Sequence, residues 1–162
     1  MRKLILGISL AVTIAGTSSI QAANIVETAQ EAGVFNTLIA AATAAGLAGA
    51  LADGKNLTVF APTDDAFAAL PDGTVETLLK PENKDKLAAI LTYHVLPREL
   101  ASNQLPGRTI HAKTIKAAGD RLLSITKSAN GVMVDEANVV TADIRADNGI
   151  VHVIDKVLLP TD

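Results

Sequence analysis

Three histidines, His94, His111 and His152, are the side chains in this 162-residue chain best suited to acid–base or metal chemistry near neutral pH. Their spacing matches no metal-ligand pattern, so a metal-assisted hydrolase would require them to converge in space with a carboxylate. His152 alternates with Ile150 and Ile154 on an apolar strand face, which favours a buried, hydrogen-bonded core histidine. We therefore predict no catalytic residue and no metal site.

A pair of carboxylates, Asp64 and Asp65, also invites an acid–base or metal interpretation. The pair follows Thr63, which is suited to cap a helix, and carboxylates in a first helical turn interact favourably with the helix dipole. Nucleophile-elbow, phosphate-loop and zinc-protease motifs do not occur in the sequence. The sequence thus predicts a protein that is not an enzyme and needs no cofactor.

Tyr93 and His94 are the remaining candidates, and they lie at the end of a predicted helix. Apolar residues recur at helical spacing from Leu87 to Leu91, and Pro97 ends this segment. The Tyr93-His94 pair could close the helix end inside the core, or it could form a contact surface for a partner. Both interpretations are open at this point.

The elements that must position these residues change from helices in the first half to strands in the second. Apolar spacing from 25 to 51 indicates short helices separated by Gly33 and Gly46, whereas strands recur about every ten residues from 109 onward. This order predicts an α+β domain, and the strands suggest an antiparallel sandwich or open barrel. The strand 150–159 is apolar on both faces, which predicts a central position. Before it, Asn148-Gly149 predicts a type I′ hairpin turn with two positive φ angles.

The first 22 residues have the order of a secretory signal peptide. A positive start, Met1-Arg2-Lys3, precedes an apolar run from Leu4 to Ile14, and small and polar residues follow up to Ala22. We expect cleavage near Ala22, which leaves one domain, 23–162, in the periplasm or outside the cell. The apolar run is shorter than a membrane span, so we expect no stable membrane insertion after cleavage. An uncleaved N-terminal anchor is the alternative.

Composition argues against several classes of partner. The formal net charge is −3 and no block of basic residues occurs, which disfavours nucleic acid as the main partner. Aromatic residues make up only 2% of the chain, so stacking platforms for single-stranded nucleic acids are missing. Cysteine is absent, and the core must therefore hold the fold without disulfides.

Three motifs together resemble the fasciclin domain family. Residues 58–67 resemble the first box of the family, residues 148–158 resemble its second box, and Tyr93-His94-Val95-Leu96-Pro97 resembles the tyrosine–histidine motif between them. The motifs have the order and spacing of the family, and the resemblance covers the single domain 23–162. It implies a wedge-shaped β-sandwich of about seven strands, with several helices in the N-terminal half.

The resemblance also implies a function and a site. It indicates an exported, non-enzymatic adhesion or protein-interaction module of the cell envelope or extracellular matrix, whose partner is a protein at the envelope or cell surface. In animal relatives receptor binding has been linked to the tyrosine–histidine motif, which here implies partner binding by Tyr93, His94, Val95 and Leu96. The alternative is a periplasmic protein that binds a small ligand or carbohydrate in a cleft between sheet and helices.

Overall fold

A computed structural model describes residues 23–116, 119 and 121–160, so the expected signal peptide lies outside the described residues. The helices are α1 (Ile25–Ala32), α2 (Asn36–Ala45), α3 (Ala48–Asp53), α4 (Asp64–Ala68), α5 (Thr74–Leu79) and α6 (Lys84–Tyr93), with 3-10 turns η1 (Pro81–Asn83) and η2 (Ser102–Gln104). The strands are β1 (Leu57–Pro62), β2 (Val95–Leu96), β3 (Thr109–Lys113), β4 (Leu122–Ser128), β5 (Gly131–Val134), β6 (Ala137–Ala146) and β7 (Gly149–Ile154).

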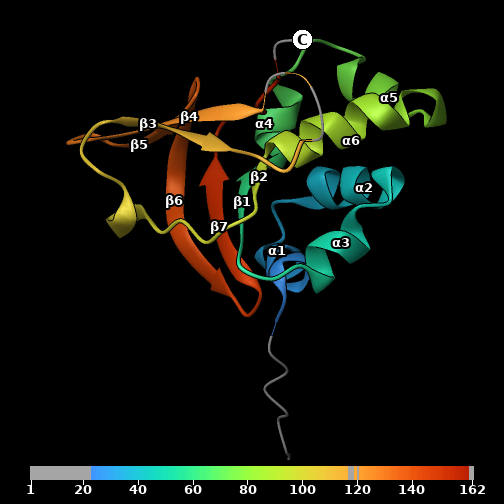
Figure 1. Ribbon diagram of the computed structural model, residues 1–162. Helices are drawn as coiled ribbons and strands as arrows, with labels where there is room; N and C mark the ends of the chain where they lie inside the picture. Colours follow the sequence, from blue (N-terminus) through green and yellow to red (C-terminus); the bar gives the residue numbers. More distant parts are fainter. Residues whose placement is uncertain (1–22, 117–118, 120, 161–162) are drawn as a thin grey trace, which may run out of the picture.

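The described strands form one bent sheet in the order β2-β1-β7-β6-β5-β4-β3. Its corner is β6, whose first residues pair with β5 and whose remainder pairs with β7 through two register shifts. Figure 1 shows the helices on one side of the molecule, strands β3 to β6 on the other, and β1 and β7 between them. The expected α+β wedge of about seven strands with packed helices is confirmed.

The last strand, β7, lies between β1 and β6, and all six of its residues are buried. This confirms its predicted central position. The strands β3 to β7 pair antiparallel with their neighbours, as the sequence suggested for the strands from residue 109 onward. The pairing of β7 with β1, for which the sequence suggested no direction, is parallel, from Leu57 opposite Gly149 to Pro62 opposite Ile154. No hairpin joins β1 to β7, and a long crossover through helices and other strands permits the parallel direction.

Gly33 and Gly46 end α1 and α2 in the left-handed conformation, as their positions between helical segments predicted. The core between these helices and the sheet forms one cluster with β1, β7 and α6. A second cluster fills the inside of the bent sheet and includes Leu96, Leu123 and Ile125. The two core clusters meet along β1 and the end of α6.

The turn before β7 differs from the predicted type I′ turn. The two-residue loop is Asp147-Asn148, and Gly149 already belongs to β7, where it pairs with Ala146 and Leu57. Neither Asn148 nor Gly149 has a positive φ angle. Glycine is required for a different reason, since a Cβ at Gly149 would lie 2.0 Å from the carbonyl oxygen of Leu57.

Asn148 joins three segments that are distant in the sequence. Its Oδ1 accepts a hydrogen bond from the backbone N–H of Ile25 at 2.8 Å, and its Nδ2 donates to the carbonyl oxygens of Leu51 at 2.7 Å and Ala52 at 3.1 Å. One side chain in the β6–β7 turn thus holds the start of α1 and the end of α3 in place.

Candidate functional site

The expected partner-binding residues, Tyr93, His94, Val95 and Leu96, lie in the interior of the protein. Their exposed fractions are 3%, 2%, 2% and 0%. Helix α6 ends at Tyr93, His94 is its C-cap, and Val95 and Leu96 form β2 against β1. Val95 belongs to the helix-side core cluster, whereas Tyr93 and Leu96 belong to the cluster inside the sheet.

This burial corrects the expectation of an exposed contact surface at the tyrosine–histidine motif. A partner that touches only the surface of the folded domain does not reach these four side chains. The physical reason is their place in the chain, because the motif connects α6 to the sheet where the two core clusters meet. Partner binding by these residues stays a prediction, and it would require the core to open.

His94 connects the end of α6 to the C-terminal segment. Its Nδ1 donates to the carbonyl oxygen of Ile90 at 2.7 Å, and its Nε2 accepts from the backbone N–H of Leu158 at 3.0 Å. Because a backbone N–H can only donate, the ring is neutral with its proton on Nδ1. Burial lowers the pKa of His94 to about 4, although the Ile90 carbonyl and the charge of Asp135 act to raise it.

Tyr93 connects α6 to the turn between β5 and β6. Its hydroxyl donates to Oδ2 of Asp135 at 2.8 Å, while Oδ1 of Asp135 accepts from the backbone N–H of Ser124 at 2.9 Å. Asp135 has a φ angle of 50°, which places it in the left-handed region of a tight turn. In this structure the Tyr93-His94 pair therefore closes the core, which was one of the two interpretations of its sequence.

Ser102, Asp143 and His152 lie together, although nothing in their sequence spacing indicates it. The Ser102 hydroxyl and backbone N–H both donate to the carboxylate of Asp143, the N–H at 2.7 Å. Nδ1 of His152 accepts from the Asp143 backbone N–H at 3.2 Å, and its Nε2 donates to the carbonyl oxygen of Leu100 at 2.7 Å. In a hydrolase triad the histidine lies between serine and acid, whereas here the serine bonds directly to the acid.

This arrangement places no imidazole next to the serine hydroxyl, and its hydrogen bonds join η2 to the corner of the sheet. Asp143 has a φ angle of 58° within the irregular part of β6. His152 is 3% exposed and stacks on Phe60 with ring centroids 5.4 Å apart, so the prediction of a buried, hydrogen-bonded core histidine is confirmed. Burial lowers the pKa of His152 against the opposing effects of the Leu100 carbonyl and Asp143.

The third histidine, His111, is exposed on β3, the strand at the opposite edge of the sheet from β2. Within the described residues, no group of three or more histidine, cysteine, aspartate or glutamate side chains could hold a metal ion. The described chain also holds no helix with the length and apolar character that crossing a membrane requires.

The carboxylate pair in the first box has a structural role that the sequence only half indicated. Thr63 caps α4 as predicted, since its Oγ1 accepts from the backbone N–H of Ala66 at 3.2 Å. Asp64, however, caps a different helix: its carboxylate accepts from the N–H groups of Thr37 at 2.7 Å and Asn36 at 3.3 Å. Partial burial acts to raise the pKa of Asp64, but the hydrogen bonds from Thr37 and Asn36 outweigh it and lower the pKa.

Replacing Asp64 with alanine should lower the free energy of unfolding at pH 7 by about 1 kcal/mol, the usual effect of losing a helix cap. Phe35 at the N-cap position of α2 offers no side-chain acceptor, so the two N–H groups would lose their protein partner. Urea denaturation measures the change. The neighbouring Asp65→Ala variant is the control, because Asp65 is exposed. An equal loss of stability in both variants would contradict the role of Asp64 as the cap of α2.

Three exposed apolar side chains on the sheet are the feature that the sequence analysis missed. Leu122, Met133 and Val140 are 51%, 41% and 60% exposed, and they lie on the neighbouring strands β4, β5 and β6. Leu123 and Val134, next to them in the chain, are fully buried on the opposite face. The sequence did contain a sign of these exposed residues: Leu122, Met133 and Val140 occupy strand positions at which a strand with one solvent-facing side normally has polar residues.

The strand residues around these side chains are mostly uncharged, but Lys113 pairs with Leu122, and the backbone N–H and side chain of Asn138 donate to the carboxylate of Asp155. Thr126, Met133 and Asn138 face one another across the three strands, so their side chains share one face. We call this surface the outer face of β4–β6 and define it by six residues: Leu122, Ser124, Thr126, Met133, Asn138 and Val140. None of the six residues itself carries a charge, and the charges of Lys113 and Asp155 lie at the edges of the surface.

Comparison with known proteins gives consistent matches. The family model for the Fasciclin domain matches residues 33–160. The protein named sll1483 of Synechocystis sp. is 49% identical over 152 residues, which span 94% of this chain and 81% of that protein. A second Synechocystis protein, sll1735, is 43% identical over 136 residues, which span 84% of this chain and 97% of its own length.

More distant matches cover only part of the similar protein. The transforming growth factor-beta-induced protein ig-h3 of Sus scrofa is 41% identical over 126 residues, which are 78% of this chain and 18% of that protein. A solved FAS1 domain pair from the insect cell adhesion molecule fasciclin I matches with a TM-score of 0.55 at 21% identity. The match covers 79% of this chain and 46% of that chain, and it shows a shared fold.

Proposed function

This chain belongs to the fasciclin domain family, and from that premise we propose that it is an exported, non-enzymatic module that binds a protein at the cell envelope or cell surface through the outer face of β4–β6. The domain that does so is 23–162, and export follows from the signal-peptide pattern of the first 22 residues. A role in adhesion fits the match to a domain pair from an insect cell adhesion molecule.

The observation that carries this proposal is the exposure of Leu122, Met133 and Val140 on adjacent strands, with Met133 in the middle strand between the other two along the sheet. Protein interfaces commonly combine a few buried apolar anchors with a polar rim that is satisfied by hydrogen bonds. On the outer face of β4–β6 these three side chains provide the anchors, and Ser124, Thr126 and Asn138 provide the rim. Lys113, which pairs with Leu122 from β3, adds a charge at the edge of this surface.

The non-enzymatic part of the proposal is supported by the polar clusters described above. Both ring nitrogens of His94 and of His152 are bonded to backbone groups. The Ser102 hydroxyl donates to a carboxylate rather than to an imidazole. These side chains stabilise the fold and do not present a nucleophile with its base.

Replacing Met133 and Val140 together with glutamate should abolish capture of the partner and leave the fold intact. Two carboxylates would require dehydration at the centre of the contact, and we expect affinity to fall at least tenfold. The purified protein is immobilised, exposed to envelope extract, and the retained proteins are identified by mass spectrometry. The affinity of a purified partner is then measured by titration.

The matched control is the pair Val34→Glu and Leu159→Glu, which changes two apolar side chains of similar exposure, 46% and 52%, that lie outside strands β4 to β6. This variant should retain the partner. Thermal melting of both variants checks that each is folded. Equal retention by the two variants would place the binding surface elsewhere, and equal loss would show that charge alone disrupts binding.

A further inference from the structure

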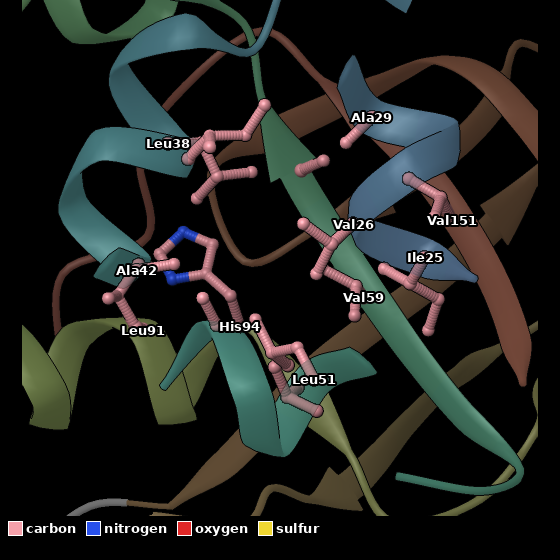
Figure 2. Close-up of a pocket in the computed structure, with 14 residues that line it drawn as sticks. Ile25, Val26, Ala29, Leu38, Ala42, Leu51, Val59, Leu91, His94 and Val151 are labelled. Atoms are coloured by element: carbon pink, nitrogen blue, oxygen red, sulfur yellow. The ribbon is translucent and has the colours of Figure 1, made fainter. Parts of the chain in front are cut away.

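The described interior between the helices and the β1–β7 part of the sheet is packed core rather than a binding site. Figure 2 shows apolar side chains of α1, α2, α3 and β1 that converge around the ring of His94. The gap that remains among them has a volume of about 40 Å³, and both nitrogens of His94 are engaged by Ile90 and Leu158. A partner of any size finds more room at the open edge of the sheet, on β3.

One side of the β3 backbone is unpaired. The N–H of Thr114, just after the strand, donates to the carbonyl oxygen of Arg121 at 2.8 Å. Hydrogen-bonded pairs alternate in an antiparallel ladder, so the even-numbered residues 110–114 are the ones whose backbone groups face β4. The odd-numbered residues face away, and no described residue bonds to their backbone N–H or C=O groups: Thr109, His111 and Lys113.

The same side of the chain does pair with a backbone one step further along. Ile115 faces the same way as Lys113, and its N–H donates to the carbonyl oxygen of Val95 at 2.9 Å. The strand β2 that holds Val95 is only two residues long, and among the described helices and strands β4 alone packs along β3. The open stretch is therefore 109–113, about 17 Å in length. An extended backbone fits it, because the N–H and C=O groups of a strand repeat on one side at every second residue.

Positive charge gathers around this open edge, although the chain is acidic overall. Residues 108–127 contain five of the 14 lysine and arginine residues but one of the 17 aspartate and glutamate residues. Arg108, Lys113 and Arg121 are exposed, and no carboxylate in the described part of the chain forms an ion pair with them. These charges favour an acidic partner. They disfavour a second copy of this chain, because pairing two β3 edges would bring both sets of cations together.

We propose that the open edge of β3 binds an extended, acidic segment of another protein, which joins the sheet as a strand antiparallel to β3. Alternate residues of the segment exchange hydrogen bonds with Thr109, His111 and Lys113, and their side chains lie on the same face as Lys113. Acidic side chains at these positions meet the positive charge, and β-branched residues between them continue the face of Ile110. The proposal concerns the edge of the sheet, so it does not require the partner proposed for the outer face of β4–β6.

A labelled peptide of about seven alternating glutamate and valine residues, with blocked ends, tests the proposal by fluorescence polarisation. It should bind the purified protein saturably at low salt, and its affinity should fall as salt is raised, because exposed charges are screened. The matched probe has lysine in place of every glutamate and should bind about tenfold more weakly or less. Absence of saturable binding by the glutamate peptide, or equal binding of the two peptides, would overturn the proposal.

N-methylation of the peptide distinguishes strand addition from attraction between charges alone. In the proposed pairing the glutamate N–H groups face β3, so methylating the glutamate nitrogens should weaken binding about tenfold or more. Methylating the valine nitrogens instead leaves the charge unchanged, and these nitrogens point away from β3, so the affinity should change little. Equal affinity of the two methylated peptides would overturn strand addition and would indicate a general site for polyanions. This comparison needs no variant of the protein.

Two pairs of protein variants locate the site. His111→Pro removes an N–H to which no described residue bonds and blocks the edge, so peptide affinity should fall about tenfold or more, whereas His111→Ala keeps the N–H and should bind. Lys113→Glu should weaken binding about fivefold or more, whereas Lys55→Glu makes the same change of charge at an exposed lysine outside β3 and β4 and should not. Thermal melting checks that each variant is folded. Equal binding within either pair would overturn this location.

Hydrogen exchange followed by NMR gives a readout at the edge itself. With the glutamate peptide at saturation, the N–H groups of Thr109, His111 and Lys113 should exchange about tenfold more slowly or less. Those of Ile110 and Ala112, which already face β4, should change little. Slowing at neither set of groups would overturn the proposal.

Two further measurements separate the proposal from its neighbours. Sedimentation of the protein alone tests the other occupant, and a dimer that is lost in His111→Pro would assign the edge to a second copy and overturn the proposal. A Met133→Ser/Val140→Ser variant removes apolar side chains from the outer face of β4–β6 without adding charge, and it should bind the glutamate peptide normally. Failure of the edge site is thereby distinct from failure of the proposed function.

Discussion

Replacing Gly149 with alanine should destabilise the domain by about 3 kcal/mol or more, the upper range for forcing atoms into a packed core. The added Cβ would lie 2.0 Å from the carbonyl oxygen of Leu57 and 2.9 Å from Cδ1 of Ile25. The first of these atoms is backbone in the parallel β1–β7 pair, so it cannot move without disturbing the ladder in the middle of the sheet. Urea denaturation followed by circular dichroism measures the loss.

Gly49→Ala is the matched control for this prediction. Gly49 lies in α3, and a Cβ at that position would meet no atom within 4 Å. Alanine is the better helix former by about 0.5–1 kcal/mol, so this variant should be as stable as the parent or slightly more stable. Unfolding of Gly149→Ala and Gly49→Ala at the same urea concentration would contradict the inference that the Leu57 backbone leaves no room for a side chain at Gly149.

Acidification from pH 7 to pH 4 should remove about 3 kcal/mol from the free energy of unfolding through His94 alone. Burial lowers the pKa of His94 in the folded protein to about 4, from an ordinary value of 6.5. Between these values the unfolded chain binds a proton that the folded chain excludes. The stability contributed by the neutral ring is therefore complete above pH 6.5 and is lost as the pH falls toward 4.

The pKa of His152 is also lowered by burial, so His152 adds to the same loss of stability in acid. Unfolding in urea at a series of pH values between 7 and 4 gives the slope, and a His94→Gln variant isolates the first histidine. Glutamine does not titrate, so this variant should be less stable at pH 7 but should lose less stability on acidification. A slope equal to that of the parent protein would assign the pH dependence to other groups.

The structural consequence of protonating His94 is local. A proton on Nε2 would face the backbone N–H of Leu158, which now donates to that nitrogen. The C-terminal segment after β7 would lose this tie to α6. We therefore expect hydrogen exchange at Leu158 to accelerate in acid before the sheet opens.

Features that depend on neighbouring residues in the chain could be predicted from the sequence. Gly33 and Gly46 end their helices, and Thr63 caps α4, because a helix end is built from residues within one turn of each other. The central position of β7 was also predictable, because a strand that is apolar on both faces needs cover on both. The three motifs were sufficient to indicate the family and its fold.

The roles of several residues could not be predicted, since they depend on distant partners. Asp64 caps α2 rather than its own helix, and Asn148 holds α1 and α3 instead of forming a left-handed turn. Gly149 is needed for the closeness of β1, which runs parallel to β7, and not for its own φ angle. Each of these outcomes is set by which segments the bent sheet brings together.

The candidate site shows the same division between local pattern and tertiary structure. Sequence pattern was enough to single out Tyr93 and His94 as a pair at the end of a helix, and it left open whether they face the core or a partner. Tertiary packing buried both, because the end of α6 lies where the two core clusters meet. Packing also left Leu122, Met133 and Val140 exposed, because the described helices α1 to α6 lie on the other side of the molecule, and strand alternation alone cannot say which face of a strand will be covered.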